Sequence, residues 1–256
     1  MYAHLNKKSG ASHTTKIIQA DTGYFLEIFV AARHLDYTEN ASFLKTIAKH
    51  PSDGSKTRDV GHAWIYLEGE INGQRVFVEG GHSGETGRVQ ARYFDGVMNY
   101  IDYGVANPRT FSLTKGQRCR EKNPIKYLWQ TQYDGFFQRG NGGHKPTFAA
   151  KVFISKEQFE SILAFISTYN FQCYTLTGGQ CSSFVAQVAS LAGLELECEV
   201  TMEIEPYLDL GKECLHLWED PTYSLITISS PDILEKSLME SVESGRAEKI
   251  NFRYTK

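Results

Sequence analysis

Cys181 is the residue of this chain best placed to act as a nucleophile. It follows the pair Gly178-Gly179 and precedes Phe184–Ala192, whose apolar residues recur at helical spacing. Gly193 comes next, where a helix commonly ends in a left-handed conformation. We therefore expect Cys181 to begin a helix, where unpaired backbone N–H groups and the helix dipole favour the nucleophilic thiolate. The alternative is a small buried residue that opens an ordinary core helix.

A thiol nucleophile needs a base, and histidine is the usual one. His62 begins the strand pattern Gly61-His-Ala-Trp-Ile-Tyr-Leu67, far upstream of the cysteine. A histidine on a half-buried strand can also be a structural residue with satisfied hydrogen bonds. Together, a histidine at the start of a strand and a cysteine at the start of a helix predict a thiol–imidazole pair.

The order of these features resembles the circularly permuted branch of the papain-like NlpC/P60 superfamily. That branch includes the lecithin:retinol acyltransferase-like proteins, and the permuted deubiquitinase-like peptidases have a similar order. The resemblance extends over about Phe25–Leu194. It implies an α+β papain-like fold, with an antiparallel sheet packed against the helix that carries Cys181. It also implies that His62 is the base and that Trp64 and Tyr66, which share its face, form walls of the cleft.

The third catalytic residue is expected on the strand that follows the hairpin signal Asn72-Gly73. A strict two-residue turn places His62 opposite Ser83, whereas a slip of one residue places it opposite His82. The resembling families use a histidine, an acidic residue or an amide on this strand to hold the imidazole. We expect His82 in this role because of the resemblance, with Glu79 as the alternative, since a carboxylate would favour the imidazolium form.

The expected reaction is attack of Cys181 on a carbonyl carbon to give an acyl-thioester, with His62 transferring the proton. The backbone N–H of Cys181 would hold the oxyanion, with Gln180 as a second donor and Gly179 allowing close approach of the substrate. We expect a hydrolase acting on an amide bond in a peptide, an isopeptide to a ubiquitin-like protein, or a cell-wall peptidoglycan stem. The alternatives are a lipid acyl hydrolase or acyltransferase with the same residues, and a catalytically inactive binding module.

The composition argues against a nucleic-acid-binding protein and against a membrane-spanning one. The net charge of -3 and the pI near 6.3 give no electrostatic reason to expect nucleic acid. The longest apolar stretch, Phe25–Ala32, is too short for a transmembrane segment and contains a glutamate. No apolar segment follows Lys7 and Lys8, so we expect no secretory signal. Hence the expected location is cytoplasmic, or outside the cell through a secretion system that needs no signal peptide.

The cysteines and histidines do not form metal-site patterns. The five cysteines are an odd number without a CxxC pair, which argues against a disulfide framework and a zinc knuckle. No HExxH motif occurs, and no third ligand lies near His62 and His82 at a suitable spacing. We therefore expect no cofactor and no metal.

The remaining patterns suggest one domain over residues 17–256, after a flexible arm at 1–16 and with an insertion or lid at about 112–146. Ser155 and Gln158 have capping-box spacing, and Pro231 suits the first position of a helix that Gly245 ends. The expected strands are residues 24–32, 62–68, 75–79, 147–154 and 249–254, and the expected helices are 40–50, 94–101, 155–170, 181–192 and 231–244.

Overall fold

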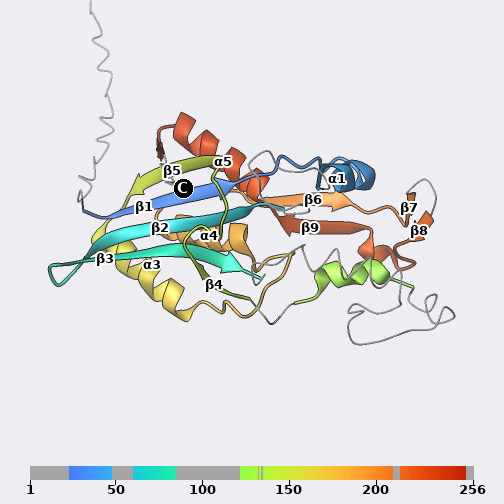
Figure 1. Cartoon of the computed structure of the whole chain (residues 1–256), viewed down its shortest axis with the longest axis horizontal. Helices are drawn as coiled ribbons and strands as arrows, with labels where there is room; N and C mark the ends of the chain where they lie inside the picture. Colours follow the sequence, from blue (N-terminus) through green and yellow to red (C-terminus); the bar gives the residue numbers. More distant parts are fainter. Residues whose placement is uncertain are drawn as a thin grey trace, which may run out of the picture.

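The main element of the chain is a six-stranded antiparallel sheet, seen in the computed structural model of Figure 1. The structure describes residues 23–47, 60–84, 122–131, 133, 135–209 and 214–251. The strand order is β10-β5-β1-β2-β3-β4. The bounds are β1 (Phe25–Ala31), β2 (His62–Ile71), β3 (Gln74–Ser83), β4 (Phe136–Arg139), β5 (Phe148–Phe153) and β10 (Glu248–Lys249). The fold is therefore mixed α+β, built on an antiparallel sheet.

The β2–β3 hairpin has the register of a strict two-residue turn. Asn72 and Gly73 have φ angles of 51° and 77°, the left-handed values that such a turn requires. Tyr66 pairs with Glu79 and Leu67 with Val78. The slipped register considered from the sequence is therefore not the one adopted, and this choice decides which face of the sheet each side chain occupies.

Three helices cover one face of the sheet: α3 (Lys156–Thr168), α4 (Cys181–Leu191) and α5 (Pro231–Glu243). The capping box of Ser155 and Gln158 is present at α3, and Ser230 caps α5 with Pro231 at its first position. Cys181 is the first residue of α4, as predicted, and Gly193 follows that helix with φ 80°. The large apolar core lies between these helices and the sheet.

The opposite face of the sheet carries a smaller apolar cluster, in which the rings of Phe29 and Trp64 stack 5.3 Å apart. The turn that joins β4 to β5 brings His144 to this face, where its ring lies 4.9 Å from that of His62. Further along the same face, Tyr66 stacks between Phe25 and Phe77. This face is called the outer face below, and the one under α3, α4 and α5 the helix face.

A second apolar core joins elements at the other end of the molecule (Figure 1). It contains Leu35, Phe43, Leu128, Leu176 and Met202, among others. The elements of this region are α1 (Asn40–Ile47), η2 (Pro124–Trp129), β6 (Glu199–Glu203), β7 (Tyr207–Asp209), β8 (Cys214–His216), η3 (Pro221–Tyr223) and β9 (Leu225–Ser229). β6 pairs with β9, and β7 with β8.

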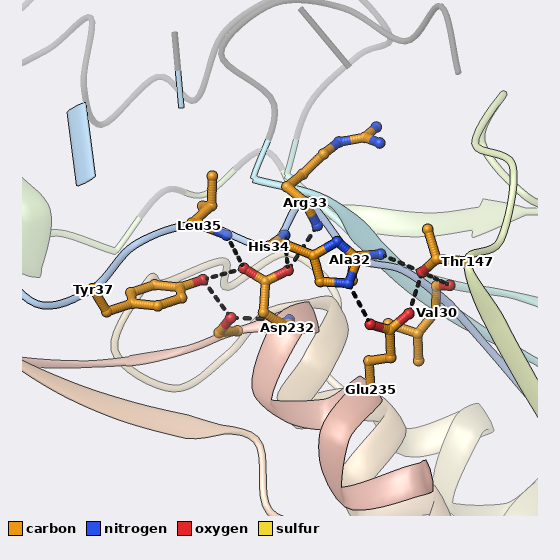
Figure 2. A network of polar contacts seen from close by, with 10 residues as sticks. Val30, Ala32, Arg33, His34, Leu35, Tyr37, Thr147, Asp232 and Glu235 are labelled. Carbon is orange, nitrogen blue, oxygen red and sulfur yellow. Dashed lines mark hydrogen bonds and ion pairs between the residues drawn. The ribbon is translucent and has the colours of Figure 1, made fainter. Parts of the chain in front are cut away.

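A carboxylate at the start of α5 fastens the segment that leaves β1 (Figure 2). Asp232 accepts hydrogen bonds from the backbone N–H groups of Arg33, His34 and Leu35 at 2.7–2.9 Å. Its second oxygen also accepts from the Tyr37 hydroxyl at 2.8 Å. His34 has a left-handed φ of 54°, and the N–H groups on this bend point toward Asp232. The His34 side chain also pairs through Nε2 with Glu235 at 2.8 Å. These hydrogen bonds fix the segment that connects β1 of the main sheet to the second core.

Several predicted segments fall wholly or partly outside the described residues. The arm at 1–16, the helix at 94–101 and residues 252–254 of the expected closing strand lie outside them. The described part of the segment 112–146 contributes β4 to the main sheet and η2 to the second core. Those residues are therefore integral to the two cores. None of the helices in the described part is long and apolar enough to cross a bilayer.

Candidate active site

Cys181 lies at the N-terminus of α4 with 2% of its surface exposed. The preceding residue, Gln180, is extended, and its N–H donates to the Ser183 hydroxyl at 2.9 Å, which closes the first turn. The Cys181 thiol donates to the Gln180 Oε1 at 3.4 Å and contacts the Ser182 hydroxyl at 3.9 Å. The sulfur therefore occupies the position, at a helix start, where the dipole favours negative charge.

His82 lies on the same face of the sheet as Cys181. Gly80 pairs with Ile65, and directly paired residues share a face, so His82 continues the row of side chains that points toward α4. Ile65 and Cys181 belong to the same apolar core. His82 is fully buried, and the rings of Tyr169, Phe171 and Tyr174 surround it edge-on.

The hydrogen bonds of His82 fix its tautomer. Its Nε2 lies 2.9 Å from the Phe171 carbonyl oxygen, which can only accept, so Nε2 carries the proton. The Tyr169 hydroxyl lies 3.3 Å from Nδ1, which is then the bare nitrogen of the ring. Burial lowers the pKa of His82 to about 4, against the opposing effect of the bond to Phe171. His82 is therefore a neutral imidazole whose lone pair lies at Nδ1, in contact with the Tyr169 hydroxyl.

Tyr169 connects the surroundings of His82 to those of Cys181. Burial and then the charge of Cys181 raise the pKa of Tyr169 to about 12. Its ring also packs against Phe184, one turn along α4 from the thiol. The Tyr169 hydroxyl therefore contacts His82 directly, and the charge of Cys181 acts on the same hydroxyl.

His62 takes a different position from the one expected. Its ring stacks on Trp64 at 5.8 Å and contacts His144 at 4.9 Å, on the outer face. Cys181 packs in the core with Ala63 and the alternate residues of β2, which point to the helix face. The sheet therefore lies between His62 and Cys181, and the expected pairing of these two side chains is not formed. The reason is the register, because side chains of successive strand residues point to opposite faces.

The environment of His62 does not suit a base. Burial, followed by the charges of His144 and His82, lowers the pKa of His62 to about 3. Its Nε2 is buried without a hydrogen-bond partner. The ring is held by stacking on Trp64, and His82 is on the opposite face, so the expected orientation of His62 by His82 does not occur.

Glu79, Trp64 and Tyr66 also belong to the outer face, so they are not next to Cys181. Glu79 pairs with Tyr66, and burial followed by the charge of Glu27 raises its pKa. The Tyr66 hydroxyl donates to Glu68 at 2.5 Å. The expected roles of Glu79 as orienting group and of the two aromatic residues as cleft walls thus have no geometric support at the thiol.

Gln180 and Gly179 hold the loop before the helix. The Gln180 side-chain nitrogen donates to the carbonyl oxygens of Ser229 and, at 3.5 Å, Leu176. Its donors are therefore turned away from the sulfur, so Gln180 positions the thiol through its oxygen and is not an oxyanion donor in this conformation. Gly179 closes a turn, since its N–H donates to the Thr175 hydroxyl at 2.6 Å.

Sequence reasoning missed Tyr169 and the Phe171 carbonyl. Both lie in the connection between α3 and α4, a segment without a recognisable motif. The only local signal was the close succession of Tyr169, Phe171 and Tyr174 ahead of the cysteine. A backbone carbonyl leaves no mark on the sequence, so its role as orienting group could not be predicted.

Among the described residues, the other thiols and potential ligands do not form a second centre. Cys173, Cys181, Cys198 and Cys214 are not joined in disulfides, and burial raises the pKa of Cys198 to about 11. Cys119 lies outside the described residues. Within the described ranges, no three histidine, cysteine or acidic side chains are grouped so as to hold a metal ion. Comparison with protein-family models, with curated proteins and with solved structures found no match.

Proposed function

We propose that this protein is a cysteine-dependent hydrolase in which Cys181 is the nucleophile and His82 is the base. One observation supports the proposal: His82 shares the helix face with Cys181, and its only lone pair is at Nδ1, because Nε2 donates to the Phe171 carbonyl. A base needs such a lone pair within reach of the proton it takes, although the geometry in a free enzyme is often loose.

The reaction would proceed through an acyl-thioester. The thiol proton passes to Nδ1 of His82 as the sulfur attacks the carbonyl carbon. The negative charge on the carbonyl oxygen is held by the Cys181 N–H at the start of α4. The imidazolium then returns the proton to the leaving amine or alcohol, the carbon–nitrogen or carbon–oxygen bond breaks, and water hydrolyses the thioester.

The orienting group in this proposal is the Phe171 carbonyl. It takes the position that a carboxylate or amide side chain has in a triad, since it accepts the proton on Nε2 and leaves Nδ1 bare. A neutral carbonyl stabilises an imidazolium less than a carboxylate does. The pair should therefore rest as thiol and neutral imidazole, and ionise when a substrate binds.

The substrate class follows from the thiol chemistry and from the resemblance to the permuted NlpC/P60 proteins. An amide is the first expectation, in a peptide, an isopeptide or a peptidoglycan stem, and a lipid ester is the alternative. Because only 2% of the Cys181 surface is exposed, turnover requires a neighbouring side chain or segment to move. Substrate binding would provide the free energy for that movement.

The test is a search for the acyl-enzyme. The full chain is incubated with peptidoglycan fragments, with ubiquitin-type isopeptides and with phospholipids, and its intact mass is measured. We expect an adduct on Cys181 with one substrate class, which neutral hydroxylamine removes because it cleaves thioesters. The matched control is Cys181→Ser. An adduct that maps to another residue, or that persists unchanged in the control, excludes the thiol mechanism.

A second function is favoured by the burial of the same thiol, which belongs to the main apolar core. In a non-catalytic binding module, Cys181 would be a packing residue. The two functions differ in what Cys181→Ala changes. In the module, the substitution leaves binding intact, whereas in the hydrolase it abolishes the adduct.

A further inference from the structure

The hydroxyl of Tyr169 occupies the one nitrogen of His82 that could accept a proton. Because Nε2 donates to the Phe171 carbonyl at 2.9 Å, Nδ1 is the remaining acceptor of the neutral ring. Tyr169 lies 3.3 Å from that nitrogen, and the phenol can donate to it. The same connection between α3 and α4 therefore supplies both contacts of the imidazole.

Tyr169 is held in this position by the fold. It caps the C-terminus of α3, where its backbone N–H donates to the Phe165 carbonyl oxygen at 2.9 Å. Its ring packs against Phe171 at 4.7 Å and against Phe184 of α4 at 5.2 Å. The hydroxyl is thus presented to His82 by two helices, and its position does not depend on a mobile surface contact.

We propose that Tyr169 is a positioning residue that keeps His82 neutral and covers its proton-accepting nitrogen, so that Cys181 remains a thiol until the tyrosine hydroxyl is displaced. This inference rests on the proposed function, because it concerns the base of the same site. Donation to the neutral ring stabilises the form that has not yet taken the thiol proton. The proton can move to Nδ1 only after that hydrogen bond breaks or after the phenol turns to act as an acceptor.

The titratable groups around His82 are few in the described structure. Tyr169 and Tyr174 face it from the connection between α3 and α4, and Cys181 lies near Tyr169 at the start of α4. The charge of His82 contributes to lowering the pKa of His62, on β2. The Tyr169 hydroxyl is protonated at neutral pH, like that of an ordinary tyrosine, and burial raises its pKa further, to about 12.

The experiment is an acid–base titration of Cys181 in the full chain, followed by the ultraviolet absorbance of the thiolate. In each background the Cys181→Ser protein is subtracted, which removes the tyrosine signals. We expect Tyr169→Phe to move the midpoint to lower pH. A hydrogen bond of this kind contributes about 1 kcal/mol, so the thiolate fraction well below the midpoint should rise roughly fivefold.

Two variants make the outcome specific. Tyr24→Phe is the matched control, since it also removes a buried tyrosine hydroxyl, one bound to the Glu70 carbonyl away from the site. It should leave the titration unchanged. In the His82→Gln background, Tyr169→Phe should have no further effect, because the ring that the hydroxyl contacts is gone.

The titrations distinguish a failure of the Tyr169 proposal from a failure of the proposed function. An unchanged midpoint in Tyr169→Phe, or a shift to higher pH, overturns the role of Tyr169. If His82→Gln itself leaves the titration of Cys181 as in the wild type, the assignment of the base is wrong and the proposed function fails with it. A response to His82→Gln without any response to Tyr169→Phe sinks only the present inference.

Discussion

Two histidines on neighbouring strands, His62 and His82, differ in whether a ring nitrogen is oriented to take the proton of the thiol. Both are buried and both have lowered pKa values. His82 has an oriented tautomer and faces the helix that carries Cys181, whereas His62 stacks on Trp64 with its Nε2 unpaired. At the scale of single residues, the face of the sheet and the bonded nitrogen decide which histidine can act with the thiol.

Acid should destabilise the protein through these two residues. The pKa of His62 falls from 6.5 to about 3 on folding, so below pH 6.5 the unfolded chain binds a proton that the folded chain does not. The free energy of unfolding is therefore highest above pH 6.5 and falls as the pH drops toward 3. Each such histidine contributes a slope of up to about 1.4 kcal/mol per pH unit.

His62→Phe should remove part of this dependence, because phenylalanine can stack on Trp64 and cannot take up a proton. Urea unfolding between pH 6.5 and pH 4 should give roughly half the slope of the wild type, the remainder coming from His82, whose pKa is about 4. An equal slope in the two proteins would show that His62 is already accessible to protons in the fold.

At the scale of elements, capping and short-range turns determine where each helix and hairpin begins. The start of α5 is the clearest case, because Asp232 both belongs to its first turn and binds the chain leaving β1 (Figure 2). Three backbone N–H groups and one hydroxyl share that carboxylate. One side chain thus fastens a segment nearly two hundred positions away in the sequence.

Asp232→Ala should therefore be strongly destabilising. Several hydrogen bonds to a charged, half-buried acceptor are lost, and about 2–4 kcal/mol of unfolding free energy should disappear. Asp36→Ala is the matched control, since that carboxylate accepts hydrogen bonds from Thr38, two residues away, and little stability should be lost. Urea titrations of both variants test this. Similar losses of stability in the two proteins would show that the hydrogen bonds to Asp232 do not hold the segment after β1 in place.

The local signals also explain which predictions succeeded. The hairpin at Asn72-Gly73, the capping box of Ser155 and Gln158, and the helix that begins at Cys181 each depend on residues within one turn, so the sequence could predict them. The site depends on register and on a backbone carbonyl. Two registers were possible for His62 and His82, and only the paired strands show which histidine faces α4.

At the scale of the whole molecule, the loop before α4 joins the two apolar cores. Leu176 packs in the second core, while Cys181 packs in the main one. Between them, Gln180 donates to the Ser229 carbonyl, and the Ser229 N–H donates to the Leu176 carbonyl at 3.2 Å. The candidate site therefore lies where the two cores meet, and a change at this junction should affect both.

Three tryptophans allow this coupling to be measured. Trp64 reports on the main sheet, whereas Trp129 and Trp218 pack against the second core. Trp→Phe substitutions give one variant that keeps only Trp64 and another that keeps only Trp129 and Trp218. The unfolding curves of these two variants should coincide when no other residue is changed. In Gln180→Ala, which leaves a buried carbonyl unpaired at a cost of about 1–3 kcal/mol, the curves should separate. Curves that stay coincident would show that other contacts couple the cores.

The central claim, that His82 and not His62 is the base for Cys181, is tested most directly by thiol reactivity. The alkylation rate of Cys181 by a small uncharged reagent is measured at neutral pH in the wild type, His82→Gln and His62→Gln, with peptide mass spectrometry identifying the site and thermal melts confirming folding. We predict a loss of roughly tenfold or more in His82→Gln and a nearly unchanged rate in His62→Gln. A loss in His62→Gln alone, or the same rate in all three proteins, would contradict the account.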